Sequence, residues 1–138
     1  MTSTPALFRT VATRDYVGFW ANDRLNARAV ARFLELDKRE IAKIVGVALT
    51  SVRFDEKMPR ALADCLEEIA NTCSLVAQFF DGDIVKTALW FKTKNPMFGD
   101  AAPREMIRDG RHERVRQFVI QATEAPVSLA ADKSTPKK

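Results

Sequence analysis

Hydrophobic residues recur every three or four positions along most of the chain, which is the period of an amphipathic α-helix. The longest such stretch follows Pro59, a residue that suits the first turn of a helix. Its apolar stripe consists of Leu62, Leu66, Ile69, Cys73, Val76 and Phe80. No segment alternates polar and apolar residues over a useful length, as an exposed β-strand would. The pattern therefore predicts an all-α fold.

The sequence predicts three shorter helices before the long one, two of them from capping residues. Asn26 can accept a hydrogen bond from the first turn of the first of them. Asp37 opens the second, and Glu40 three residues later completes a capping box. This helix should end at Gly46, because glycine tolerates the left-handed conformation of many helix exits. A short third helix is expected near residues 49–54.

Further helices are predicted after the long one. The sequence Asp-Gly-Asp at 81–83 interrupts the apolar pattern, and Asn95 is biased away from helix by the proline that follows it. The expected helices cover residues 84–90, 103–109 and 112–122. Beyond Pro126 the composition turns to Ala, Ser, Lys and Pro, which is typical of a flexible tail.

Composition narrows the functional classes. A chain of 138 residues can bury a core without disulfides. Cys65 and Cys73 lie eight positions apart in one predicted helix, about 12 Å along its axis, so they cannot bridge each other. Two cysteines and one histidine show no spacing typical of a metal site, and we expect neither a metal nor another cofactor. The absence of a signal peptide or a ~20-residue apolar run favours a cytoplasmic protein without a membrane partner.

Charge is distributed unevenly along the chain. Residues 26–60 carry a net charge of +3, residues 61–83 carry −5, and residues 132–138 carry +2. A basic segment beside an acidic one suits a chain that meets nucleic acid with one part and another protein with a different part.

Three small or apolar residues surround the turn at Gly46. Ala42, Gly46 and Val52 have the spacing of a small residue between helices, a turn glycine and a buried anchor of the third helix. This segment resembles an Xre-type helix-turn-helix. The resemblance implies DNA binding, with operator contacts from Lys43, Thr50, Ser51, Arg53 and Lys57. This set offers few groups that could recognise bases, so a degenerate helix-turn-helix kept as a structural brace is the alternative.

Residues 90–115 carry a second pattern, formed by Trp90, Asn95, Pro103 and the Asp109–Gly110 turn before a last amphipathic helix. Their order and spacing resemble the Xre/MbcA/ParS toxin-binding domain of bacterial antitoxins. Val115 and Phe118 match apolar positions of its last helix. One position departs from the pattern: the family usually has proline immediately before the asparagine, whereas here proline follows it.

The two resemblances together imply a type II antitoxin. Such a protein would neutralise a cognate RES-domain toxin that consumes NAD, form a hetero-oligomer with it, and repress their shared operon. The expected toxin contacts are Trp90, Asn95, Arg104, Arg108, Arg111, Arg114, Val127 and Leu129. The implied organisation is an arm (1–22), a helix-turn-helix (23–60), a connecting helix (61–76), a toxin-binding domain (77–125) and a basic tail (126–138).

Two other functional classes compete with the antitoxin hypothesis. A stand-alone DNA-binding regulator without a toxin partner is the main alternative. An enzyme is not expected, because His112 is the only histidine and lacks a serine or cysteine partner at a catalytic spacing. The pattern leaves open whether the stripe at residues 62–80 forms the core or a homodimer interface.

Overall fold

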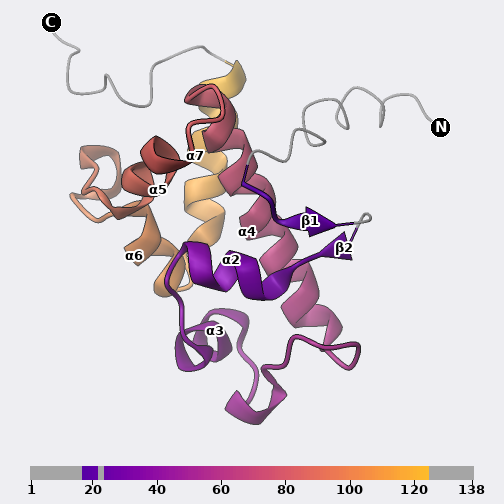
Figure 1. Cartoon of the computed structure of the whole chain (residues 1–138). Coiled ribbons are helices and arrows are strands. Elements are labelled where there is room, and N and C mark those ends of the chain that lie inside the picture. Colours follow the sequence, from indigo (N-terminus) through magenta and orange to yellow (C-terminus); the bar gives the residue numbers. More distant parts are fainter. Residues whose placement is uncertain (1–16, 22–23, 125–138) are drawn as a thin grey trace, which may run out of the picture.

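The computed structural model describes residues 17–21 and 24–124, and within them the chain is predominantly helical (Figure 1). The predicted all-α class is confirmed, with one addition. A small antiparallel hairpin pairs β1 (Trp20–Ala21) with β2 (Arg24–Leu25). The sequence did not indicate it, because strands of two residues are too short to produce an alternating pattern. Most of the predicted arm and the whole 126–138 tail lie outside the described residues.

The first two helices begin at the predicted residues, and the second also ends where predicted. The Asn26 side chain accepts a hydrogen bond from the Ala29 N–H (3.1 Å) and caps α2 (Ala27–Phe33). Asp37 and Glu40 form the reciprocal capping box at the start of α3 (Lys38–Val45). Gly46 ends α3 with a φ of 83°, a left-handed conformation that favours glycine. These predictions are confirmed.

The predicted third helix over 49–54 is wrong in length and type. The structure has only a 3₁₀ turn, η1 (Leu49–Ser51), after which buried Val52 is extended. No helix resumes in the described residues before α4, because the Asp55 carboxylate accepts a hydrogen bond from the Lys57 N–H (2.9 Å) and closes a turn of its own. An aspartate that bonds local backbone in this way competes with helix continuation.

The remaining helices follow the predicted order. They are α4 (Arg60–Phe79), α5 (Ile84–Lys92), α6 (Pro103–Arg108) and α7 (His112–Glu124), with a 3₁₀ turn, η2 (Pro96–Phe98), between α5 and α6. The last helix is two residues longer than expected. Asp83 caps α5 by accepting from the Lys86 N–H (3.0 Å). None of the helices over residues 17–21 and 24–124 combines the length and apolarity needed to cross a bilayer.

Helix α4 is the central element of the molecule. It runs alongside α7 and packs against α2, α3 and α5, with α5 and α6 on one flank and α3 at the lower end (Figure 1). Leu62, Leu66, Ile69, Cys73 and Val76 are all buried in one core cluster that also takes in residues from Phe19 to Ala122. Because that stripe is filled by the chain's own helices, it forms the core rather than a dimer face. The predicted segments 23–60 and 77–125 share this core.

Candidate functional site

Trp90 and Asn95, the two residues that define the toxin-binding pattern, are buried. The Trp90 side chain is 7% exposed, packs edge-on against Phe91 (5.0 Å between ring centroids) and stacks on Phe118 (6.4 Å). Asn95 is 4% exposed, and its side chain accepts a hydrogen bond from the Met97 N–H (2.9 Å). Their assignment as direct toxin contacts therefore has to be corrected, because both side chains are occupied in holding the fold together.

The family pattern usually has proline before the asparagine, whereas this chain has Lys94 before it and Pro96 after it. The loop that these residues build explains this difference. Asn95 caps η2, and Pro96 occupies its first turn. The Asn95 N–H donates to the Ala101 carbonyl (3.1 Å), and the Asp100 N–H donates back to the Asn95 carbonyl (3.0 Å). The Asn-Pro order thus produces a closed loop between α5 and α6 that keeps its backbone groups paired.

The predicted arginines have different roles. Arg104 lies in the angle between α6 and the end of α2, where its guanidinium donates to the carbonyls of Leu34 (2.5 Å) and Glu35. These bonds satisfy carbonyls that a helix end leaves without an intrahelical partner. Arg108 lies 4.0 Å from a Glu40 carboxylate oxygen and joins α6 to α3. Both residues therefore stabilise the packing of the fold, and Arg104 is less available to a partner than predicted.

Arg111 and Arg114 are the accessible members of the predicted set. Arg111 is exposed in the turn before α7. Arg114 is also exposed, and its Nη2 donates to the Met97 carbonyl at 3.3 Å, a long hydrogen bond that a partner could replace. Val127 and Leu129 lie outside the described residues.

Sequence reasoning missed an exposed apolar surface on α5. Val85 and Leu89 are 77% and 61% exposed and lie one turn apart, so they share one side of the helix. Lys86 and Lys92, both exposed, flank them, and Lys92 Nζ forms an ion pair with the Glu35 carboxylate (2.6 Å). We call these four residues of α5 the α5 face. The sequence indicated only that Val85 and Leu89 share one side of α5; the burial of Thr87, Trp90 and Phe91 on the opposite side is what leaves them exposed.

Other exposed apolar side chains lie at both ends of α5 and elsewhere. Ile84 at its start is 38% exposed, and Met97 in the following 3₁₀ turn is 53% exposed. Leu49 in η1 is 47% exposed. Exposed apolar residues are common individually, but two large ones at the centre of one helix face are typical of a protein-binding surface.

The predicted DNA contacts lie on the surface around η1, but their geometry is unfavourable for base recognition. Lys43, Thr50, Arg53 and Lys57 are exposed, and Ser51 is half-buried. A 3₁₀ turn of three residues is about 6 Å long, too short to place several side chains along a major groove.

Arg53 is the strongest base-contact candidate of the set, and it is already paired. Its guanidinium bonds the Asp55 carboxylate (Nη2 to Oδ2, 2.8 Å), which lowers the pKa of Asp55. The same hydrogen bond raises the pKa of Arg53. Operator contact through Arg53 would have to break this exposed pair.

No family model matches this chain, and no curated protein or solved structure is significantly similar to it.

Proposed function

We propose that this protein is an antitoxin that binds and neutralises a cognate RES-type, NAD-degrading toxin through its C-terminal helices. The order of Trp90, Asn95, Pro103 and Gly110 supports the class of partner by resemblance. The α5 face carries the proposal structurally, since it supplies an accessible apolar surface in the same part of the chain.

The α5 face has the layout of a helix that docks into a groove of a partner. Its centre is apolar and its edges are basic, as protein interfaces with a hydrophobic core and a polar rim usually are. Anchors at i and i+4 are typical of helix-in-groove recognition. Full burial of Val85 and Leu89 would contribute about 1.5–3 kcal/mol for each side chain before the costs of association. Lys86 would favour acidic residues around the groove, whereas Lys92 would have to exchange its ion pair with Glu35 for a toxin carboxylate.

Inhibition by such a protein requires only occlusion of the toxin's active site. The chain needs no catalytic group of its own if it covers the mouth of the NAD pocket. Of residues 122–129, the part that follows α7 is the proposed plug, because Val127 and Leu129 could enter an apolar pocket, whereas Ala122 is buried in the core. Arg111 and Arg114 are the accessible cations that could pair with toxin carboxylates.

Repression of a shared operon is the second half of the proposal and has weaker support. The short η1 turn and the Arg53–Asp55 pair favour the brace interpretation of the helix-turn-helix. The same observations weigh against a stand-alone DNA-binding regulator, which would need a strong recognition surface. Contacts from Lys43 and Lys57 to phosphates, with specificity supplied by the toxin–antitoxin complex, remain compatible with repression.

The central experiment co-expresses this chain with the product of its neighbouring gene and measures growth and cellular NAD. The wild-type chain should restore both. Leu89→Asp should weaken toxin binding by about thirtyfold, or roughly 2 kcal/mol, because it removes apolar burial and places a charge in the groove. Leu49→Asp is the matched control, since it makes the same change at another exposed apolar position. Continued NAD loss with folded wild-type chain present would refute the proposal.

Two truncations separate the plug from the helical body. Deletion of residues 132–138 should leave inhibition unchanged, because the segment has little apolar surface. Deletion from residue 125 onward also removes Val127 and Leu129 and should weaken inhibition. If both truncated proteins inhibit as well as the full chain, occlusion comes from the helical body.

A further inference from the structure

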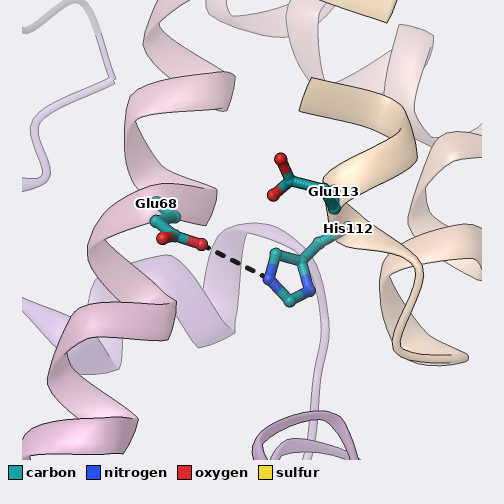
Figure 2. A group of neighbouring side chains, drawn as sticks. All are labelled: Glu68, His112 and Glu113. Carbon is teal, nitrogen blue, oxygen red and sulfur yellow. Dashed lines mark ion pairs between the residues drawn. The ribbon is translucent and has the colours of Figure 1, made fainter. Parts of the chain in front are cut away.

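Four side chains with metal-binding atoms meet where α7 packs against α4. Cys65 and Glu68 are one turn apart on α4, and His112 and Glu113 are the first two residues of α7. Figure 2 shows the Glu68 carboxylate and the His112 ring pointing toward each other across the gap between the helices, with the Glu113 carboxylate beside them. The proposed toxin contacts do not include any of these four residues.

The distances between these atoms suit a shared cation. His112 Nε2 lies 3.5 Å from Glu68 Oε1 and 3.8 Å from Cys65 Sγ. One ligand atom each from Glu68, His112 and Glu113 lies within 4.8 Å of the other two. Bonds of 2.0–2.2 Å from tetrahedral zinc to nitrogen and oxygen place such ligands about 3.3–3.6 Å apart, and a bond of 2.3 Å to sulfur widens the edge slightly. The distances from His112 Nε2 to Glu68 and to Cys65 are close to these values, whereas Cys65 lies outside the group of three ligand atoms and its side chain has to rotate to bring sulfur to the same ion.

The histidine presents one particular nitrogen to the cluster. His112 Nδ1 is buried without a hydrogen-bond partner among the described residues, whereas Nε2 is directed at Glu68 and Cys65. A neutral imidazole with its lone pair on Nε2 would be a metal ligand in this orientation.

We propose that Cys65, Glu68, His112 and Glu113 form a binding site for a divalent transition-metal ion of the zinc class. Imidazole nitrogen and thiolate sulfur are ligands that zinc prefers, whereas calcium and magnesium are bound almost entirely by oxygen. Binding transfers the Cys65 thiol proton, together with any proton on Nε2, to solvent. The ion would join the middle of α4 to the start of α7.

A bound dication would stabilise the Cys65 thiolate and offset the charges of Glu68 and Glu113. Glu113 also pairs with Arg116 (3.2 Å), so the metal competes with an exposed ion pair of small energetic value.

The alternative is that Glu68 and His112 form only an ion pair between two helices. Zinc titration of the full chain, stripped of metal and kept reduced, distinguishes these cases by isothermal titration calorimetry. We expect one equivalent of Zn²⁺ to bind. Glu68→Gln should weaken its affinity at least about tenfold, and Glu67→Gln, its exposed neighbour on α4, should leave the affinity unchanged. Glu68 is half-exposed, so its replacement by glutamine keeps the fold testable.

Cobalt reports which atoms bind the metal. Co²⁺ should give the intense visible bands of tetrahedral coordination and a near-ultraviolet thiolate-to-cobalt band. Cys65→Ser should remove the thiolate band, whereas Cys73→Ser, at the other cysteine, should retain it. The proposal is overturned if the wild-type chain binds less than one equivalent of zinc, or if Glu68→Gln and Glu67→Gln bind it equally well. Loss of binding in Glu68→Gln with the thiolate band unchanged in Cys65→Ser would exclude Cys65 as a ligand.

Discussion

Replacement of Arg104 by alanine should destabilise the fold rather than remove a partner contact. The guanidinium donates to two carbonyls at the end of α2, those of Leu34 and Glu35, about seventy residues earlier in the sequence. Leu34 itself is buried. Alanine at position 104 would leave its carbonyl without a hydrogen-bond donor, and it would remove a link between α2 and α6.

The expected loss follows from the two hydrogen bonds. A hydrogen bond from a charged donor contributes about 1.5–3 kcal/mol when its site is dry. Water can replace the bond to Glu35, which is exposed, so most of the loss comes from the Leu34 carbonyl. We expect Arg104→Ala to lower the free energy of unfolding by about 2–3 kcal/mol, and Tm by about 10 °C for a domain of this size.

Urea unfolding followed by circular dichroism measures this loss directly. The midpoint should fall with an unchanged m-value, since the surface exposed on unfolding stays the same. Arg104→Lys should retain part of the stability, because it keeps one charged donor. Arg111→Ala is the control and should change stability by less than about 0.5 kcal/mol. Equal stability of Arg104→Ala and Arg111→Ala, with toxin binding lost only in the former, would refute the structural role of Arg104.

Three other predictions test roles assigned by burial and pairing. Trp90→Ala should cost about 3–5 kcal/mol of stability, because it empties a core position between Phe91 and Phe118. The protein that remains folded should keep its affinity for the toxin. A fully stable variant that no longer binds would restore Trp90 as a contact. Metal-free protein should lose stability as the pH rises from about 9 toward 11, because folding raises the pKa of the Cys65 thiol from 9.0 to about 11 and thereby favours its neutral form. Cys65→Ser should reduce this loss of stability in urea titrations. A pH profile identical to that of the wild type would contradict the assignment. Arg53→Ala should change affinity for the chain's own promoter by less than about threefold in gel-shift titrations, since Arg53 is paired with Asp55. A loss of about 1–3 kcal/mol in binding free energy would instead indicate base recognition.

Local sequence determined most helix boundaries in this protein. Asn26, Asp37 and Glu40 cap their helices as predicted, and Gly46 ends one of them. Capping depends on hydrogen bonds between residues three positions apart, so the necessary information lies within a few neighbouring residues. The buried stripe of α4 was equally predictable, because its residues recur at the helical period.

The prediction of a helix over residues 49–54 was wrong for a local reason as well, but only the structure shows which local hydrogen bonds form. Asp55 follows directly after the predicted third helix, and from the sequence alone its carboxylate could equally have pointed to solvent. Its bonds to Arg53 and to the Lys57 N–H hold a local turn where the predicted helix would have ended, and the helical conformation stops at Ser51. The hairpin before α2 was missed for a related reason, since two paired residues per strand carry no periodic signal.

Tertiary structure alone decided which of the candidate residues can reach a partner. Trp90, Asn95 and Arg104 were as suitable for contact as Arg111 by residue type, but the first three are engaged by neighbouring elements. The opposite holds for Val85 and Leu89, which look like core residues in the sequence and lie on the surface. The approach of Cys65 to His112 joins residues forty-seven positions apart. Helix periodicity specifies which side chains share a face, but only packing against the other helices decides which face is covered.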